Sequence, residues 1–391
     1  MIISYISTYP PTRCGIGAYT NYLSRALLKV DEEVKVAVIA ERGAAKVEEP
    51  RLRALPCFDR REDYPPRVLE ALDQMDHNLR VVHIQHEFAI FNPDERFLAL
   101  LEGLKLAERK VVVTLHTVHT NETSDWEGMA MSMEDYNRRV GELADAVVIH
   151  QRSQREALLR QGLSEEAVHL IPHGTELLER QVPQLQGKEE ARAALGLPQE
   201  GRIILSFGFL GGRYKNKGVL IEALARLLDR IPDVHLFFSG YPREGSLEDL
   251  ESKLKLEERA RQLGLEGRVH FAERFIPDEE VHLVFGASDV AVFPYLQSFF
   301  SASGALHLAM GAGLPVVVSR IPKFEEVSQE ISPEVTFDPH DPEELAKVLM
   351  RLLGDGDFER KILERVRAYA LRTSWEEVAR AHMRLYRALV G

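Results

Sequence analysis

Three cations flanked by glycines stand where a short apolar run gives way to a helical pattern. The stretch FGFLGGRYKNKGVLIEAL (207–224) carries Arg213, Lys215 and Lys217, and the helix is expected directly after Lys217. Glycines such as Gly212 let the backbone approach a ligand closely, and a helix N-terminus offers unpaired N–H groups to an anion. The stretch therefore predicts a diphosphate site. A phosphate-binding P-loop is not present, because GxxxxGK[ST] is absent. The alternative is a basic loop exposed to solvent.

A second glycine-containing turn follows the first apolar run of the chain. STYPPTRCGIGAYTNYL (7–23) places Gly15 and Gly17 where a helix should start, which again permits close backbone approach to a ligand. Residue 20 is Thr, so the GxGxxG pattern is incomplete, and no acidic residue ends an obvious second strand to hold an adenosine ribose. A standard dinucleotide site is therefore disfavoured.

The segment SASGALHLAMGAGLPVV (301–317) has no formal charge, although 28% of the chain is charged. Ser303 and Gly304 stand at the expected start of its helix, after a strand and a short loop. In open α/β sheets such helix starts bind anionic ligands, so a phosphate is the expected ligand. The alternative is that small residues only let a core helix pack closely.

Two series of short apolar runs alternate with amphipathic stretches. Strands that are apolar on both faces, with helices between them, predict parallel α/β sheets, here two of them. The first series is expected at 2–7, 34–40, 81–85, 110–115, 146–149 and 168–171, and the second at 202–208, 234–240, 268–272, 290–295, 314–319 and 335–337.

The two series predict two domains, which also suits the length of 391 residues. The polar stretch 182–190 contains Pro and Gly and lacks an apolar period, so we expect the linker there, between domains at 1–181 and 191–373. The last stretch, 374–391, begins with a Ser cap followed by Glu377, and its apolar residues have helical spacing. It predicts a terminal helix with one face to bury.

Composition excludes several classes of protein. The formal charge of −12 and the pI near 5.7 argue against a nucleic-acid binder. Cys14 and Cys57 stand alone, so neither a disulfide framework nor a thiolate zinc site is indicated. The first residues lack the features of a signal peptide, and no run of 18 apolar residues follows. We therefore expect a cytoplasmic protein without an integral membrane segment.

Histidines lie at several expected strand ends. His116 ends the run VTLHT, a position typical of ligand-contacting residues in a parallel sheet. His83 and His86 have an odd separation, which points them to opposite faces of one strand and argues against a shared metal. His173 is expected near the domain boundary, in either a site or a turn. His307 is expected to pack inside its helix.

The chain resembles the retaining GT-B glycosyltransferases of family 4 along nearly its full length. The resemblance rests on seven motifs in the family's order: Pro-Pro…Cys-Gly-Ile-Gly, IQHEF, VTLHT, LIPHG, Lys217–Gly218, the Ser-Gly helix and LPVVVS. It implies two Rossmann-like domains facing one another across a cleft, with the sugar nucleotide mainly on the C-terminal domain, the acceptor on the N-terminal one, and the final helix returning to the N-terminal domain.

The motifs and the resemblance together assign roles to residues. Cations and N–H dipoles stabilise a leaving diphosphate, and in this family that phosphate is thought to act as the base. We expect no metal site. The expected catalytic residues are His116, Lys217 and Arg213; the expected donor-binding residues are Gly15, Gly17, Gly212, Ser301, Ser303, Gly304, Glu326 and His173; and His86 and Glu87 are expected on the acceptor side, or as braces of the following loop.

One departure from the family concerns its two glutamates, eight positions apart. Phe300 and Leu308 stand at those positions, and neither can hydrogen-bond a hydroxyl group. The resemblance implies that the ribose contact moves, with Glu325 or Glu326 as candidates, and that sugar recognition passes to backbone N–H groups and to serines. The candidate serines are Ser298, Ser301 and Ser303. The chain resembles a subgroup with this Ser-Gly pattern.

The expected activity is transfer of a hexose to a hydroxyl acceptor, either a carbohydrate or a small molecule. GDP-mannose and UDP-glucose are both candidate donors, and the subgroup favours mannose. Two alternatives stay open: a non-catalytic protein that binds nucleotide sugars, and a GT-B epimerase that interconverts a sugar nucleotide without an acceptor. The sequence leaves the oligomeric state open.

Overall fold

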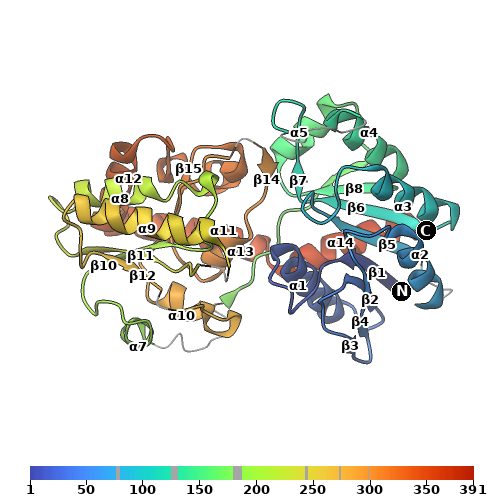
Figure 1. Ribbon diagram of the computed structural model, residues 1–391, viewed down its shortest axis with the longest axis horizontal. Coiled ribbons are helices and arrows are strands. Elements are labelled where there is room, and N and C mark those ends of the chain that lie inside the picture. Colours follow the sequence, from blue (N-terminus) through green and yellow to red (C-terminus); the bar gives the residue numbers. More distant parts are fainter. Residues whose placement is uncertain (76–79, 125–130, 179–186, 243–244, 273, 298) are drawn as a thin grey trace. The chain divides into compact units, whose positions relative to one another are not determined.

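The computed structural model describes residues 1–75, 80–124, 131–178, 187–242, 245–272, 274–297 and 299–391, apart from the side chains of Arg213 and Asp278. The chain forms two compact units (Figure 1). The N-terminal unit comprises Met1–Gly174, Phe299–Gly304 and Thr373–Gly391, and the C-terminal unit comprises Thr175–Ser298 and Ala305–Arg372. The division after Gly174 precedes the predicted linker at 182–190, of which 182–186 lie outside the described residues.

The N-terminal unit contains an eight-stranded sheet in the order β3-β4-β2-β1-β5-β6-β8-β9. Neighbouring strands are parallel except β3 and β4. The strands are β1 (Ile2–Ser7), β2 (Lys35–Glu41), β3 (Val47–Glu48), β4 (Leu52–Phe58), β5 (Val81–His86), β6 (Lys110–Leu115), β8 (Ala146–Ile149) and β9 (Val168–Leu170). The predicted runs at 2–7, 110–115 and 146–149 are confirmed with their bounds.

Helices cover both faces of this sheet, which explains why its central strands are apolar throughout. One core joins inward-facing residues such as Ile6 and Val113 to α2 (Pro65–Met75), α3 (Glu95–Leu106), α4 (Met133–Leu143) and α5 (Arg152–Arg160). The other joins Ile3 and Val112 to α1 (Gly15–Val30) and α14 (Trp375–Val390). Alternate residues of each strand thus enter different cores.

The terminal helix α14 lies beside β1 and β5 in the N-terminal unit (Figure 1). The predicted cap is confirmed, since the Ser374 side chain accepts a hydrogen bond from the Glu377 amide. Inside the core, the Tyr386 hydroxyl lies 2.9 Å from the Tyr5 hydroxyl and 2.6 Å from His83 Nδ1. These contacts join α14 to two neighbouring strands by polar groups that are fully buried.

Two features of the N-terminal unit were not predicted from the sequence. Strand β4 pairs with β2 although it contains Pro56, and its partner on the other side is only the two-residue β3. In addition, β14 (Phe300–Ser301) pairs antiparallel with β7 (Thr117–Val118). A segment from late in the sequence therefore extends the turn that follows β6.

The C-terminal unit contains a fully parallel six-stranded sheet in the order β12-β11-β10-β13-β15-β16. All six runs of the second predicted series are confirmed as strands. The strands are β10 (Arg202–Ser206), β11 (Val234–Phe238), β12 (Val269–Phe271), β13 (Val290–Phe293), β15 (Val316–Ser319) and β16 (Thr336–Phe337). The helices are α7 (Lys188–Ala194), α8 (Gly218–Leu227), α9 (Leu247–Gln262), α10 (Val281–Gly286), α11 (Gly304–Gly311), α12 (Pro342–Gly354) and α13 (Gly356–Arg372).

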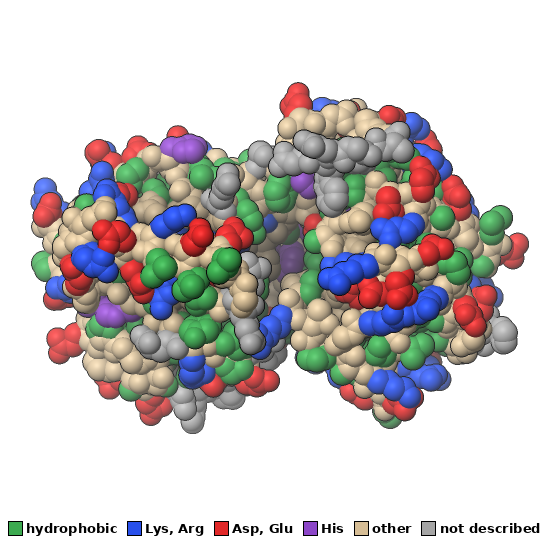
Figure 2. Space-filling view, viewed as in Figure 1, with side chains coloured by type: hydrophobic (Ala, Val, Ile, Leu, Met, Phe, Trp, Pro, Cys, Tyr) green, Lys and Arg blue, Asp and Glu red, His purple; other side chains and the backbone are tan. Residues whose placement is uncertain are grey.

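Charged side chains of both signs are interspersed on the face of each unit that Figure 2 shows. This mixture agrees with the net charge of −12 and shows no single basic field on that face. A search of the described helices found none long and apolar enough to cross a membrane.

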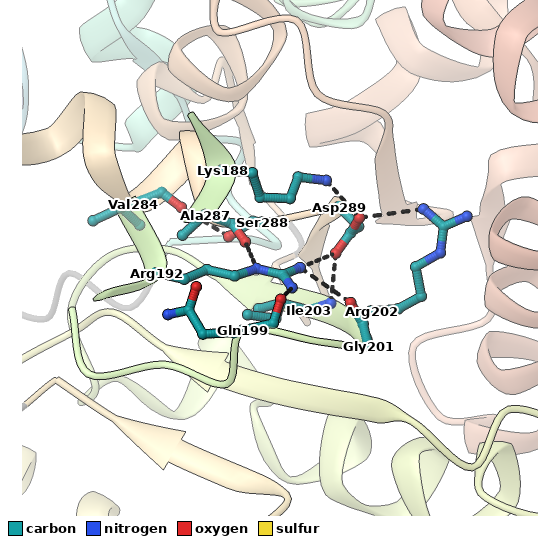
Figure 3. Close-up of polar contacts among 10 residues, drawn as sticks. All are labelled: Lys188, Arg192, Gln199, Gly201, Arg202, Ile203, Val284, Ala287, Ser288 and Asp289. Atoms are coloured by element: carbon teal, nitrogen blue, oxygen red, sulfur yellow. Dashed lines mark hydrogen bonds and ion pairs between the residues drawn. The ribbon is translucent and has the colours of Figure 1, made fainter. Parts of the chain in front are cut away.

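A buried carboxylate holds α7 onto the C-terminal sheet (Figure 3). Asp289 accepts hydrogen bonds from Arg192 Nη2 at 2.9 Å, Lys188 Nζ at 2.7 Å and the Ile203 amide at 2.7 Å. Arg192 is 3% exposed and also donates to three backbone carbonyl groups. Because both charges are buried, each depends on the other for compensation.

We predict that Asp289→Ala lowers the free energy of unfolding by roughly 3–5 kcal/mol, because it leaves Arg192 buried without its counter-charge. Urea unfolding followed by circular dichroism measures this loss. Lys188→Met is the matched control: its side chain is 48% exposed, so its loss should cost less than about 1 kcal/mol. Equal effects of the two substitutions would contradict this account of the cluster.

Candidate functional site

The predicted site residues divide between the two units. Those in the N-terminal unit are Gly15, Gly17, His86, Glu87, His116, His173, Ser301, Ser303 and Gly304, and those in the C-terminal unit are Gly212, Arg213, Lys217 and Glu326. Most of them follow the carboxyl ends of parallel strands, where the chain leaves the sheet.

A cluster of rings surrounds Tyr19 in the N-terminal unit. Tyr19 lies edge-on to His116, His173 and Trp375, with ring centroids 4.7, 5.2 and 4.9 Å away. His150 packs against the same ring at 5.4 Å. We call these five residues the Tyr19 cluster. It joins α1, α14 and the ends of three strands.

Hydrogen bonds connect two histidines of this cluster to each other and to the backbone. His150 Nδ1 donates to the Ile171 carbonyl oxygen at 2.9 Å, and His150 Nε2 lies 3.2 Å from His116 Nδ1. Burial lowers the pKa of His116 well below its ordinary value, with neighbouring histidines adding to the shift, so its ring is neutral.

Gln85 completes this chain of hydrogen bonds. Its amide oxygen, Oε1, lies 2.8 Å from His116 Nε2, so the ring nitrogen is the donor in this contact. Both ring nitrogens of His116 thus have partners within the N-terminal unit. A substrate hydroxyl group could reach His116 Nε2 only by replacing Gln85.

Other residues of the N-terminal unit that were predicted to bind the sugar nucleotide lie close to this cluster. Gly304 begins α11, and a Cβ atom added there would lie 3.5 Å from His173 Nε2. Ser301 is held in β14 opposite Thr117, directly after His116. The structure therefore brings His116, His173 and Gly304 together.

The glycines at the start of α1 have different surroundings. A Cβ atom at Gly17 would lie 3.2 Å from the Tyr9 amide nitrogen, so Gly17 permits close packing of the protein's own loop. A Cβ atom at Gly15 would meet no atom within 4 Å. Of the two, Gly15 has the open space that a ligand would need.

The residues expected on the acceptor side support the loop after β5. His86 is fully buried, and its Nε2 lies 2.9 Å from the Tyr136 hydroxyl. The Glu87 carboxylate accepts from the Thr117 hydroxyl at 2.7 Å and from the Phe88 amide at 3.0 Å. These contacts join the end of β5 to α4 and β7.

In the C-terminal unit, Lys217 stands directly before α8 and is 6% exposed. Its ammonium group lies 3.3 Å from Ser206 Oγ and 3.2 Å from the Gly208 carbonyl oxygen. Burial lowers its pKa to about 7, and Lys215 adds to this shift. No carboxylate within the described residues forms an ion pair with it.

The loop before Lys217 depends on its glycines. Gly208 and Gly212 both have φ of +95°, a conformation that strongly favours glycine. The Gly212 amide donates a hydrogen bond to Glu248 at 2.9 Å. Gly212 was predicted to bind the sugar nucleotide, and its amide thus already has a partner within the protein. The side chain of Arg213 lies outside the described part of the structure.

Glu326 lies beneath α11 rather than at an open edge, and is 6% exposed. Its carboxylate accepts from the Tyr369 hydroxyl at 2.8 Å and lies 3.4 Å from His307 Nε2. His307 Nδ1 in turn lies 2.7 Å from the Thr175 hydroxyl. The buried His307 ring therefore has a polar neighbour at each of its two nitrogens.

Four residues at the two sites were not assigned from the sequence: Tyr19, Gln85, His150 and Tyr295. His150 carries the same signal as His116, since it directly follows a buried parallel strand. Tyr295 likewise follows β13 closely. Tyr19 and Gln85 lie inside apolar patterns, where no sequence signal separates them from core residues.

Comparisons with known proteins cover most of the chain. The family model described as "Glycosyl transferases group 1" matches residues 187–370, and the one described as "Glycosyltransferase Family 4" matches residues 14–177. A D-inositol 3-phosphate glycosyltransferase from Corynebacterium urealyticum is 34% identical over 206 residues, which are 51% of this chain and 46% of that relative. The match thus spans about half of that relative.

Two further comparisons extend over more of the chain. A phosphatidyl-myo-inositol mannosyltransferase from Mycolicibacterium smegmatis is 27% identical over 304 residues, covering 77% of this chain and 71% of that relative. The solved structure of sucrose-phosphate synthase from Thermosynechococcus elongatus has a TM-score of 0.73 at 22% identity, covering 100% and 99% of the two chains. This structural likeness concerns the fold.

Because histidines are buried in the N-terminal unit, we expect the free energy of unfolding to fall in acid. Burial lowers the pKa of His382 to about 4 and that of His86 to about 3. Because the unfolded chain binds these protons near pH 6.5, the stabilisation present above that pH is lost as pH falls below it. We expect His382→Phe to reduce the stability difference between pH 7 and 5.5 by about 1 kcal/mol.

Urea unfolding at the two pH values measures this difference. His340→Gln is the control, because His340 is exposed and its replacement should leave the pH dependence as in the original chain. An unchanged difference for His382→Phe would mean that His382 does not stay neutral in the folded protein.

Proposed function

Since the chain belongs to the group 1, family 4 glycosyltransferases of the GT-B fold, we propose that it transfers a hexose from a nucleotide-diphosphate sugar to a hydroxyl acceptor with retention of configuration. Group 1 glycosyltransferases use nucleotide-sugar donors. The proposed donor is GDP-mannose or UDP-glucose, and the mannosyltransferase relative favours mannose. The proposed acceptor is a carbohydrate or a small molecule with a hydroxyl group.

The observation that carries this proposal is the buried Lys217 ammonium group, which has no carboxylate in an ion pair within the described residues. A buried charge without a counter-ion is costly, so the site favours an anionic ligand. A diphosphate meets this need at the junction of β10 and α8. As the glycosidic bond breaks, charge grows on the departing diphosphate, and a fixed cation stabilises it more than it stabilises the substrate.

We propose that the N-terminal unit positions the sugar and its acceptor. Gly15 has open space beside its Cα atom, and Gly304 stands at the start of α11 next to His173. Backbone N–H groups at these helix starts can receive phosphate or sugar oxygens. His116, kept neutral by burial, supports this edge through its contacts with Gln85 and His150.

We predict that Lys217→Ala lowers the transfer rate on the order of a hundredfold while leaving the fold intact, because one charge aimed at the leaving group is lost. The assay follows release of GDP or UDP from a panel of sugar nucleotides, with and without acceptors. Lys255→Ala, in an exposed lysine paired with Glu251, is the control. A Lys217→Ala enzyme within threefold of the original rate would overturn the assignment.

The same panel separates transfer from the other activities of this architecture. Net conversion of the sugar nucleotide without release of nucleotide would indicate an epimerase. Binding without any turnover would indicate a non-catalytic protein.

We also predict that transfer continues in the presence of a strong chelator. Within the described residues, no three His, Cys, Asp or Glu side chains are arranged to hold a metal ion, so lysines are proposed to neutralise the diphosphate. Initial rates with and without EDTA test this. Loss of activity that manganese restores would show that a metal performs this role.

A further inference from the structure

Lys215 is held in a fixed position by Tyr295. Its ammonium group donates a hydrogen bond to the Tyr295 hydroxyl at 2.8 Å and lies 4.0 Å from the centroid of the same ring. The Tyr214 ring lies 5.1 Å away. Tyr295 is 3% exposed and packs against Phe324 at 5.3 Å, so it forms a rigid support.

The two lysines differ in their partners from two other cations of the described chain. Arg192, which is 3% exposed, is paired with Asp289, and Arg60, which is 32% exposed, is paired with Glu41. Lys215 and Lys217 have hydroxyl groups, a carbonyl group and aromatic rings, and no ion pair with a carboxylate within the described ranges. An aromatic face and a neutral hydroxyl group hold an ammonium ion without cancelling its charge.

We propose that Lys215 is a second ammonium group of the diphosphate site, acting beside Lys217, and that Tyr295 is its positioning residue. This inference rests on the proposed function. A diphosphate carries charge on two phosphoryl groups, and two ammonium groups from one glycine-rich loop can each donate to one of them. The loop joins β10 to α8, so both cations belong to the same strand–helix junction.

Proton uptake on binding follows from this arrangement. Burial lowers the pKa of Lys215 to about 8 and that of Lys217 to about 7, so near neutral pH the empty pair is incompletely protonated. A bound diphosphate favours both charged forms and raises both pKa values. Binding should therefore take up protons, and affinity should fall as pH rises through 7 to 8 and above.

Other charged or titratable groups face this pair from neighbouring elements. Asp249 on α9 raises the pKa of Lys217, opposing the effect of burial. Glu248, also on α9, accepts the Gly212 amide. Burial raises the pKa of Tyr295 above its ordinary value, so this hydroxyl group stays neutral near pH 8. The lysines are thus the groups expected to change protonation in this range.

The test is isothermal titration calorimetry with GDP and with UDP at pH 7.5, in two buffers of different ionisation enthalpy. Lys215→Met should weaken binding of the nucleotide about tenfold or more and reduce proton uptake. Lys215→Arg should restore most of the affinity without restoring the uptake, because arginine is always charged. A purely structural role for Lys215 would not separate these two quantities.

Two further variants test the role of Tyr295 and control for the loss of a positive charge. Tyr295→Phe keeps the ring and removes the hydroxyl group that accepts from Lys215, and it should weaken binding severalfold. Lys255→Met removes an exposed lysine, 79% accessible, from α9 and should change neither quantity. Thermal unfolding of each variant checks that the fold is retained.

The outcomes distinguish this inference from the proposed function. If Lys217→Ala abolishes binding while Lys215→Met stays within twofold of the original affinity, the inference is wrong and the proposed function stands. A large loss with Arg213→Gln and none with Lys215→Met would assign the second cation to Arg213. If the original chain binds neither GDP nor UDP, the proposed function itself fails for these donors.

Discussion

Parallel pairing brings the carboxyl ends of the central strands to one edge of each sheet, and the candidate sites depend on this constraint. His116 follows β6 and His150 follows β8, and these strands are neighbours. In the other unit, the loop that carries Lys215 and Lys217 follows β10, while Tyr295 follows the adjacent β13. Residues far apart in sequence therefore meet because their strands pair in the same direction.

Buried charges of the chain serve two different purposes. The Asp289 carboxylate is surrounded by cations and a backbone amide, and these contacts join α7 to the strands β10 and β13 (Figure 3). Lys217 and Lys215 instead have only neutral partners. The first arrangement is satisfied within the protein. The second gains from an external anion, which is how burial of charge distinguishes a structural cluster from a binding site.

The regular elements were largely predictable from the sequence, because strands covered on both faces are continuously apolar. β1, β6 and β8 have the predicted bounds. β4 was missed because Pro56 and the exposed Arg53 interrupt its pattern, and pairing with β2 overrides that local signal. Pairing between β7 and β14 could not be predicted, since two short segments separated by nearly half of the chain carry no mutual signal.

The two apolar residues at the family's glutamate positions are both used in packing. Phe300 pairs with Val118 through its backbone and packs against the core of the N-terminal unit, and Leu308 packs against the core of the C-terminal unit. Glu326, the candidate replacement, is held by Tyr369 beneath α11. A carboxylate at Phe300 or Leu308 would lose apolar contacts and be desolvated among them. Apolar side chains at the two positions therefore suit the packing of both cores, and we propose that recognition of the donor relies more heavily on Lys215 and Lys217.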